Sequence, residues 1–399
     1  MKILVVCQHY WPENFRITEI CEELVSRGHQ VTALVGLPNY PTGVVPPEYK
    51  RFRNRHQQHG GVTIRRCCEI GRRNSKLGLA VNYVSYMLSA SWHALWMKRD
   101  YDVIYAYSTS PVLMSLPASL LRCFTRKKLL IYILDIWPAC LAAMNVGEGA
   151  ALYRLMRRVS RWVYRKADLL AYSSKRFQGY LKSVHGIQVT TDQYLPQFAD
   201  SLFDSLPPAR TSSELQLVFA GNIGKMQNVQ VLIRAAALLR GQPVHWHILG
   251  DGSDYAACEA LVKEHALEPC VTLYGRRPLA DMPRFYALAD AMLVSMRNDP
   301  SVNDTLPGKV QSYMAAGKPI LGSITGETPL ILEEAGCGLC APPDDPAAFA
   351  ALVQAFMARS DHAEMGERGR RYSQEHFTKK GHMDQLERML LELCGKDGA

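Results

Sequence analysis

Short apolar runs alternate with amphipathic segments along almost the whole chain. The first run is Lys2–Cys7, and a helical pattern over Ile17–Arg27 leads into a second run, Gln30–Gly36. The same half of the chain contains four more strand-like runs: Val103–Tyr107, Leu129–Leu134, Leu169–Tyr172 and Gln188–Tyr194. Continuous apolar runs of this length are typical of strands that are buried on both faces, so the alternation predicts a parallel sheet covered by helices.

A Pro- and Ser-rich stretch, Ser201–Glu214, interrupts this alternation and is the best candidate for a linker. Six further strand-like runs follow it: Leu215–Ala220, Val244–Leu249, Val271–Tyr274, Ala291–Val294, Pro319–Gly322 and Gly338–Ala341. The pattern predicts an α/β protein of two Rossmann-like domains, residues 1–203 and 204–378, which face a cleft with ligand at the carboxyl ends of the strands. We expect a final charged helix, within residues 379–399, to return to the first domain.

The charge of the chain is unevenly distributed. Residues 1–205 carry 27 Lys and Arg against 14 Asp and Glu, whereas residues 206–399 carry 19 against 23. A basic half attracts either nucleic acid or an anionic lipid surface, and no nucleic-acid-binding motif supports the first alternative. The 11 Cys and the lack of a secretion signal favour a reducing cytosol, and no pattern of Cys or His predicts a metal site.

The segment Asp304–Leu321 carries the clearest chemical signal in the sequence. A turn at Pro307 and Gly308 places Lys309 at the start of a short apolar helix. The free N–H groups of a helix start attract anions, and Lys309 adds a full positive charge. The segment therefore predicts a site for the phosphates of a nucleotide-linked ligand, to which we assign Asp304, Thr305, Leu306, Pro307, Lys309 and Ser312.

Three other loops follow predicted strands in the same half of the chain. Their candidate ligand-binding residues are Gly221, Asn222, Gly224, Lys225, Gln227 and Asn228 in the first loop, Gly250 and Gly252 in the second, and Arg276 in the third. The glycines allow a backbone to approach a phosphate closely, and the polar side chains supply hydrogen-bond donors. Each loop alone is equally compatible with an ordinary turn or a helix cap, but four such loops at four strand ends favour a binding site.

In the first half, the loop Tyr10–Arg16 follows the first strand and should border the ligand site. We take Glu13, Arg16 and Asp135, together with Lys309, as the candidate catalytic residues. Arg16 either reaches a diphosphate or caps the loop, and Asp135 either orients a hydroxyl group or caps a helix. His9, His93 and His185 have no partner that the sequence identifies, so we interpret them as structural residues.

Two segments of the basic half are candidates for contact with a membrane. Leu77–Met97 is apolar, contains two Trp and is interrupted by polar residues. It is a spanning helix, a helix lying in the membrane interface, or a core helix, and the polar interruptions favour the interface. Tyr153–Lys166 contains six cations, each of which contributes about 1 kcal/mol near an anionic leaflet, unless the segment is only a solvated charged face.

Several motifs resemble those of the family-4 glycosyltransferases of GT-B fold, and in particular the WbuB/WcaI-like branch that builds O-antigen, capsule and colanic-acid repeat units. They are G-N-I-G-K-M-Q-N-V from Gly221, H-I-L-G-D-G from His247, V-T-L-Y-G-R from Val271, Y-M-A-A-G-K-P from Tyr313, R-G-H-Q-V from Arg27 and L-D-I-W-P from Leu134. The resemblance implies a UDP-sugar donor, retention of anomeric configuration and no catalytic metal or other cofactor. The chain departs from the family pattern, because Asn222 and Gln227 stand where the family has Arg and Lys, and Asp304 and Ser312 stand where it has two glutamates.

The resemblance thus implies a retaining glycosyltransferase of bacterial surface-polysaccharide and lipopolysaccharide biosynthesis. Its donor would carry an N-acetylhexosamine or a 6-deoxy-N-acetylhexosamine, and its acceptor would be a saccharide linked to a polyprenyl diphosphate. We expect a cytoplasmic protein that is attached peripherally to the inner face of the cell membrane and binds no nucleic acid. Two alternatives stay open: a UDP-sugar epimerase on the same fold, and a non-catalytic membrane-associated binding protein.

Overall fold

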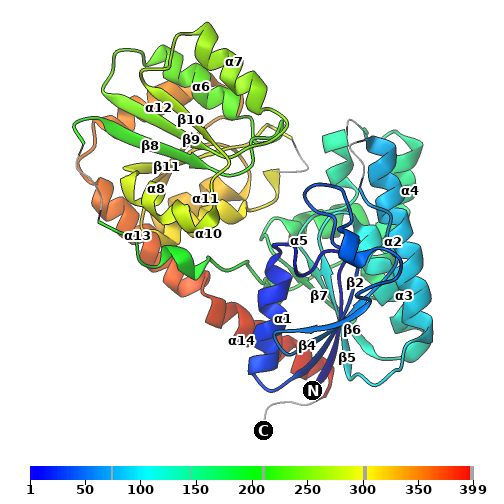
Figure 1. The fold of residues 1–399 in the computed structure, drawn as a ribbon. Coiled ribbons are helices and arrows are strands. Elements are labelled where there is room, and N and C mark those ends of the chain that lie inside the picture. The colour runs from blue at the N-terminus through cyan, green and yellow to red at the C-terminus, as the bar shows by residue number, and fades with distance from the viewer. Residues whose placement is uncertain (73–74, 145, 209–211, 300–302, 396–399) are drawn as a thin grey trace. The chain divides into compact units, whose positions relative to one another are not determined.

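The computed structural model describes residues 1–72, 75–144, 146–208, 212–299 and 303–395 (Figure 1). The chain forms two compact units. Met1–Leu195 with Met383–Ala399 makes up the first unit, and Pro196–His382 makes up the second. Each unit is a sheet with helices on its faces, so the predicted fold class of two Rossmann-like α/β domains is confirmed.

The first unit contains a seven-stranded sheet with strand order β3-β4-β2-β1-β5-β6-β7. Every neighbouring pair is parallel except β3 and β4. Its strands are β1 (Lys2–Val6), β2 (Gln30–Val35), β3 (His56–His59), β4 (Val62–Arg66), β5 (Val103–Ser108), β6 (Lys128–Ile133) and β7 (Leu169–Tyr172). Its helices are α1 (Arg16–Ser26), α2 (Lys76–Trp96), α3 (Leu116–Thr125), α4 (Ala151–Lys166) and α5 (Phe177–Tyr180).

The second unit contains a six-stranded parallel sheet with strand order β10-β9-β8-β11-β12-β13. Its strands are β8 (Leu215–Ala220), β9 (Val244–Leu249), β10 (Val271–Gly275), β11 (Ala291–Ser295), β12 (Ile320–Ser323) and β13 (Gly338–Ala341). The helices that follow are α6 (Val229–Leu238), α7 (Tyr255–Glu264), α8 (Met282–Leu288), α10 (Gly308–Ala315), α11 (Glu327–Ala335), α12 (Pro346–Met357) and α13 (His362–His376). The strand order reverses at β8 and β11, and open α/β sheets bind ligands at such a switch point.

The last helix, α14 (Lys379–Leu393), packs on the first unit from Met383 onward. Arg27 Nη1 donates hydrogen bonds of 2.8 Å to both Asp384 and Glu387, and His29 Nε2 lies 2.7 Å from Glu387. Gln385 donates to two backbone carbonyl groups of the same unit. The expected return of the C-terminal helix to the first half of the chain is therefore confirmed.

Two features of the first unit differ from the sequence prediction. Gln188–Tyr194 is not a strand, because Thr190 and Gln193 form a reciprocal capping box around a short 3-10 turn, which leaves one isolated bridge between Tyr172 and Tyr194. Strands β3 and β4, in contrast, were not predicted. The sequence of β3, His-Gln-Gln-His, has no apolar alternation, and β3 is a strand because its backbone pairs with β4 across the Gly60–Gly61 turn.

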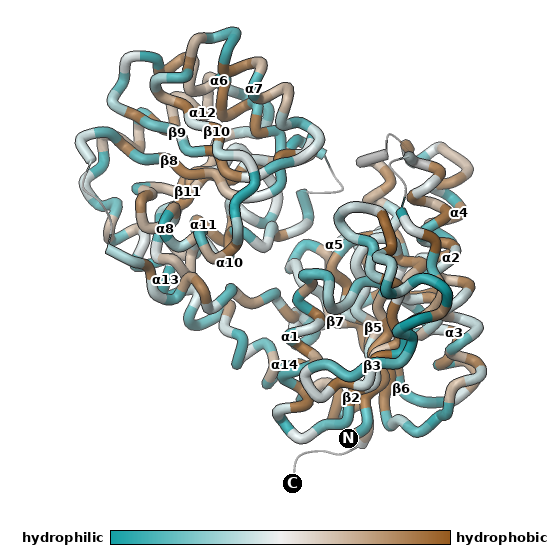
Figure 2. The backbone as a smooth tube through the Cα atoms, viewed as in Figure 1, coloured by the Kyte–Doolittle hydropathy of each residue, from teal (hydrophilic) through white to brown (hydrophobic). Residues whose placement is uncertain are grey.

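Helix α2 carries apolar side chains on its exposed face as well as on its buried face. Tyr86, Ala90 and Ala94 are buried in the core, while Leu88, Trp92 and other apolar side chains are exposed. Figure 2 colours the backbone by hydropathy and shows apolar positions along α2. No helix within the described parts of the chain is long and apolar enough to cross a membrane.

Candidate active site

Two glycine loops press against each other at the carboxyl ends of β8 and β9. Gly221 and Gly250 have φ angles of +143° and +136°, which L side chains rarely adopt. A Cβ atom at Gly250 would lie 1.7 Å from the carbonyl oxygen of Gly221, and one at Gly252 would lie 2.4 Å from that of Ile223. Only glycine permits this close backbone approach, which leaves a shallow, backbone-lined surface at the switch point.

Lys309, the second residue of α10, reaches back into this region. Its Nζ lies 3.9 Å from the centre of the Phe219 ring, and a Cβ atom at Gly221 would be 2.9 Å from the same nitrogen. Although part of the side chain is exposed, Nζ is buried and has no hydrogen-bond partner among the described residues. Burial lowers the pKa of Lys309 to about 7. A buried ammonium group without a carboxylate is costly unless an anion joins it.

The end of β8 and helix α10 are held together by Tyr313. Its hydroxyl donates to the carbonyl oxygen of Ala220 at 3.0 Å and lies 3.2 Å from the Ala220 backbone nitrogen, which donates to it. Tyr313 is fully buried. This contact fixes Lys309 relative to the glycine loop, so the ammonium group is positioned by the fold before any ligand binds.

The polar side chains of the first loop mainly shape the loop itself. Gln227 Oε1 accepts hydrogen bonds from Asn222 Nδ2 at 3.0 Å and from the backbone of Gly224 at 3.2 Å. Asn228 has a φ of +44°, precedes α6 and donates to Asp344. Asn222 and Gln227 therefore replace the two cations of the family pattern by a neutral amide pair, and Lys309 is the buried cation that remains.

The other predicted donor-site residues lie around the same switch point in different environments. Lys225 and Arg276 are exposed, Asp304, Thr305 and Pro307 are half-buried, and Leu306 is buried. Ser312 is buried, and its hydroxyl is 3.5 Å from the Gly308 carbonyl oxygen, which is a weak contact. The sequence prediction placed these residues together, and the topology brings the loops after β8, β9 and β10 and the start of α10 to one edge of the sheet.

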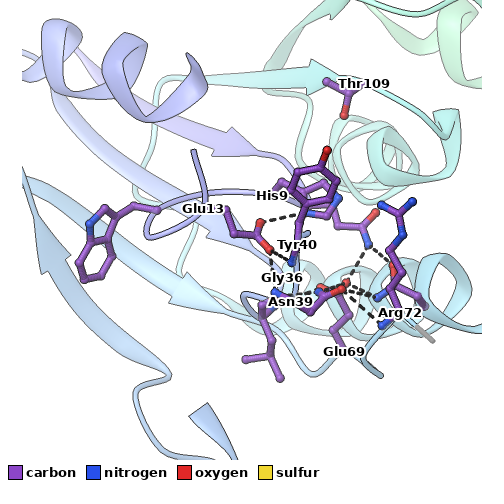
Figure 3. Close-up of polar contacts among 12 residues, drawn as sticks. His9, Glu13, Gly36, Asn39, Tyr40, Glu69, Arg72 and Thr109 are labelled. Carbon is purple, nitrogen blue, oxygen red and sulfur yellow. Dashed lines mark hydrogen bonds and ion pairs between the residues drawn. The ribbon is translucent and has the colours of Figure 1, made fainter. Parts of the chain in front are cut away.

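In the first unit, His9 and Glu13 form a buried pair after β1 (Figure 3). His9 Nδ1 lies 2.8 Å from Glu13 Oε2, and the other carboxylate oxygen of Glu13 accepts from the backbone nitrogens of Asn39 and Tyr40 at 2.7 and 2.6 Å. The His9 ring stacks on Phe15 with 4.7 Å between ring centres. These contacts orient the imidazole and leave its Nε2 for another partner.

A second buried carboxylate, Glu69, lies beside this pair (Figure 3). Its Oε1 accepts from the side-chain amides of Gln8, Asn39 and Asn82 at 2.8, 3.0 and 2.6 Å, and its Oε2 accepts from the Leu37 backbone at 3.0 Å. Burial raises the pKa of Glu69 to about 7, although these donors act in the opposite direction. The carboxylate ties the loops after β1, β2 and β4 to the first half of α2.

Asp135 and Arg16 belong to the same end of the first sheet. Asp135 follows β6, and its burial raises its pKa against hydrogen bonds from Ser110 that lower it. Arg16 and Asp135 both act electrostatically on the hydroxyl of Tyr107, so the three groups lie near one another. The sequence prediction for Arg16, Glu13 and Asp135 named these residues but missed His9 and Glu69. The only available signal was the spacing of four residues between His9 and Glu13.

Two doubly wound α/β sheets, one in each unit, define the GT-B class of fold. The family described as "Glycosyl transferase 4-like domain" matches residues 14–191, and the family described as "Glycosyl transferases group 1" matches residues 214–359. The chain belongs to these group 1, family-4 glycosyltransferases, so the resemblance noted in its motifs is confirmed, and the protein is a glycosyltransferase.

Two curated relatives have names that refer to glycosyl transfer. WbjE of Pseudomonas aeruginosa is 28% identical over 69% of this chain and 70% of its own length. WcaI of Escherichia coli, named for colanic acid biosynthesis, is 23% identical over 91% of this chain and 93% of its own length.

Solved structures show the same fold. Sucrose-phosphate synthase from Thermosynechococcus elongatus has a TM-score of 0.76 at 18% identity and covers 99% of each chain. Anabaena HepE in complex with UDP-glucose has a TM-score of 0.69 at 16% identity and covers 98% of this chain and 100% of its own.

Proposed function

We propose that this glycosyltransferase moves a sugar from a UDP-sugar to a lipid-linked saccharide in the biosynthesis of a bacterial surface polysaccharide. The observation that carries the proposal is the buried Nζ of Lys309, which has no partner in the described structure and lies against the glycine loop at the switch point. A diphosphate supplies the missing anion, and the two free N–H groups at the start of α10 supply further donors.

The chemistry of donor cleavage explains why the cation is needed. When the bond from the sugar to UDP breaks, negative charge develops on the β-phosphate, and groups already aimed at that position stabilise it. Removal of one such group typically raises the barrier by about 2.7–4 kcal/mol. Lys309 is the main group in this role, with Lys225 and Arg276 as exposed cations next to it.

We assign the remaining donor contacts by their environment. Gly221, Gly224, Gly250 and Gly252 let the backbone approach the diphosphate and sugar, and Asn222, Gln227 and Asn228 hold that loop in shape. Asp304 and Ser312, with Thr305, Leu306 and Pro307 beside them, lie where the nucleoside would bind. Ser312 offers a single hydroxyl in place of the family's carboxylate.

The acceptor belongs to the first unit. Arg16, Glu13 and Asp135, which the sequence analysis proposed, lie at the carboxyl edge of its sheet, and the structure adds His9 to them. We assign the acceptor hydroxyl to the open Nε2 of His9, with Glu13 holding the ring. In a retaining reaction the departing phosphate takes the acceptor proton, so His9 positions the hydroxyl.

The names of similar proteins support the choice of donor and pathway. HepE was solved with UDP-glucose, and WcaI is named for colanic acid, a polysaccharide. The resemblance to the WbuB/WcaI-like branch favours an N-acetylhexosamine or its 6-deoxy form as the transferred sugar. The acceptor that fits this pathway is a saccharide on a polyprenyl diphosphate.

The surface of the first unit supports peripheral attachment to the cytoplasmic leaflet. Helix α4 exposes Leu152, Leu155 and Trp162 beside the exposed cations Arg154, Arg157, Arg158 and Arg165. An apolar face bordered by cations is typical of a helix that binds an anionic membrane surface. A lipid-linked acceptor lies in that leaflet, so attachment there brings the enzyme to its substrate.

The test is calorimetric titration with UDP, GDP, ADP and a panel of UDP-sugars, followed by assay of UDP release with and without a lipid-linked acceptor. We expect UDP binding that Lys309→Met abolishes and that the exposed-lysine control Lys263→Met retains. UDP release that requires the acceptor identifies a transferase. Conversion of the sugar without an acceptor would instead identify an epimerase, and no nucleotide binding would leave a non-catalytic binding protein.

A further inference from the structure

A cavity of about 380 Å³ lies in the first unit, between the second half of α2 and the β3–β4 edge of the sheet. A volume in this range is typical of small-molecule sites. Its lining combines aromatic, aliphatic and cationic side chains and contains no carboxylate: Leu34, Phe52, Arg55, His56, Arg65, Arg66, Cys68, Trp92, His93, Trp96 and Met97.

The arginines of this cavity are not all used by the protein. Arg66 donates to Gln57 at 2.7 Å and to the carbonyl oxygen of Gly36 at 3.3 Å, so it is part of the fold. Arg55 donates from Nη1 to the Cys67 carbonyl oxygen at 3.1 Å, but Arg55 and Arg65 each have a buried Nε that finds no partner in the described parts of the chain. Two guanidinium groups with unsatisfied donors and no lining carboxylate fit an anion, and guanidinium groups suit phosphate in particular.

The apolar side of the cavity is exposed and continuous with a longer stripe. Phe52, Trp92 and Trp96 are 76%, 64% and 74% exposed. Along α2 the exposed apolar positions are Leu77, Val81, Val84, Leu88, Trp92 and Trp96. Their spacing of three or four residues places them on one face of the helix, opposite the buried Tyr86, Ala90 and Ala94.

We propose that this cavity binds the phosphate headgroup of an anionic membrane lipid, with Arg55 and Arg65 on the phosphate and the acyl chains along Trp92, Trp96 and the apolar face of α2. This inference rests on the peripheral attachment in the proposed function. Charge complementarity selects the anion, and the exposed aromatic and aliphatic side chains select a lipid over a free phosphate ion. Trp is the residue that favours the headgroup level of a bilayer.

The test is vesicle co-sedimentation of the full chain with neutral phosphatidylcholine vesicles and with vesicles that also contain phosphatidylglycerol, both free of any acceptor. The double variant Arg55→Gln/Arg65→Gln removes the two charges, and Arg240→Gln/Arg284→Gln removes two exposed arginines of the second unit as a matched control. We expect the first variant to bind anionic vesicles roughly 10- to 30-fold more weakly, since each cation contributes about a fivefold factor, and to bind neutral vesicles as the wild type does.

Tryptophan fluorescence gives an independent readout of the apolar side. We expect anionic vesicles to shift wild-type emission to the blue, and Trp96→Ala to lose part of this shift. Inorganic phosphate should compete only weakly. Full competition by inorganic phosphate, or equal anionic-vesicle binding by the wild type and Arg55→Gln/Arg65→Gln, would overturn the lipid-headgroup site.

Two controls distinguish failure of the lipid-headgroup site from failure of membrane attachment and from failure of the donor site. If the wild type binds neither kind of vesicle, peripheral attachment itself is wrong and the headgroup site is wrong with it. Thermal unfolding of the full chain reports that the first unit of each variant is folded, and UDP binding by the second unit is expected to be unchanged throughout. A nucleotide-binding failure would therefore count against the donor site alone.

Discussion

At the scale of single residues, Lys309 is the cation on which the proposed diphosphate site depends. The family pattern offers several cations, whereas here Asn222 and Gln227 bond to each other and leave the charge to Lys309. Burial lowers the pKa of Lys309 to about 7, so the free enzyme holds this group half-protonated near neutral pH. Diphosphate binding favours the protonated form and therefore raises the pKa of this group.

The first prediction is that UDP affinity depends on pH through Lys309. Above about pH 7 the ammonium fraction of the free enzyme falls tenfold per pH unit, so the affinity should fall by about the same factor. Near pH 8.5, calorimetry in buffers of different ionisation enthalpy should report uptake of nearly one proton per UDP. Lys263→Met should keep the wild-type pH dependence, because it leaves Lys309 in place.

The stability of the same variant checks the cause. An unfolded lysine titrates near its ordinary value of about 10.4, so between about pH 7 and that value the unfolded chain binds more protons than the folded one. The free energy of unfolding therefore rises with pH across that window. Below the window, the buried ammonium group lowers the free energy of unfolding by its full amount. Lys309→Met should thus melt higher than the unliganded wild type at pH 6, with the difference shrinking toward pH 10. An equal difference at both pH values would contradict a buried ammonium group.

Gly250 gives a second residue-scale prediction. Gly250→Ala introduces backbone strain of about 1–3 kcal/mol and a methyl group 1.7 Å from the Gly221 carbonyl oxygen. We expect a lower melting temperature for the second unit and loss of UDP binding. Gly241→Ala is the matched control, because Gly241 has a φ of +83° with no atom near its Cβ position. If both variants bind UDP equally well, the close approach of the two loops is not needed for the donor site.

The His9–Glu13 pair gives a third residue-scale prediction. Removal of the imidazole by His9→Ala takes away the group that positions the acceptor hydroxyl, so we expect kcat to fall by roughly 10²-fold while UDP affinity stays unchanged. The kcat of Glu13→Gln should fall less, because the His9 ring remains but a carboxylate no longer sets its orientation. Steady-state kinetics with separate titration of donor and acceptor measures this. An unchanged kcat in both variants, with His376→Ala as control, would leave the pair a structural contact.

At the scale of elements, the sequence predicts what depends on continuous apolar runs. All six strands of the second unit lie within one residue of their predicted bounds, because each is an apolar run that ends at Gly, Pro or polar residues. Strand β3 depends instead on a tight hairpin with β4 across Gly60–Gly61, and the polar residues His56–His59 show no apolar alternation that would reveal it. The donor site follows the same rule. The position of Lys309 at a helix start was readable, but the contact of its Nζ with Phe219 and the Asn222–Gln227 bond required the fold.

Helix α14 gives the element-scale prediction. Arg27 is half-buried between Glu23, Asp384 and Glu387, so Arg27→Ala should destabilise the first unit by about 1–2 kcal/mol at neutral pH. Partial burial acts to raise the pKa of Glu387, but hydrogen bonds from Arg27 and His29 lower it overall. Glu387 therefore stabilises the folded unit at pH values above the ordinary pKa range of a glutamate, and this stabilisation is lost as the pH falls through the lowered pKa.

Thermal unfolding at pH 7 and at pH 3 measures both parts of this prediction. The difference between wild type and Arg27→Ala should shrink at the lower pH. Lys2→Ala is the control, because the Lys2–Asp100 pair is exposed and should contribute little at either pH. An Arg27→Ala variant as stable as Lys2→Ala would mean that the contacts of α14 do not stabilise the unit.

At the scale of the whole molecule, the uneven charge assigns different tasks to the two halves of the chain. The first half carries the excess of cations and the exposed apolar faces of α2 and α4, whereas the second half is slightly acidic and carries the donor site. An anionic leaflet attracts the first and weakly repels the second. Under the proposed function, the first half binds the membrane and the second half binds the water-soluble nucleotide sugar.

This division predicts that charge on α4 controls transfer to acceptors in a membrane but not the chemistry itself. Arg157→Glu/Arg158→Glu reverses two exposed charges, so we expect binding to anionic vesicles to weaken by more than tenfold at low salt. Because salt screens the attraction between cations and lipid, the difference in vesicle affinity between wild type and variant should shrink as the salt concentration rises. Transfer to a lipid-linked acceptor embedded in vesicles should fall in parallel, while transfer to a short-chain acceptor in detergent should stay at the wild-type rate. Loss of both activities would place these arginines in the transfer reaction, and loss of neither would exclude α4 from attachment.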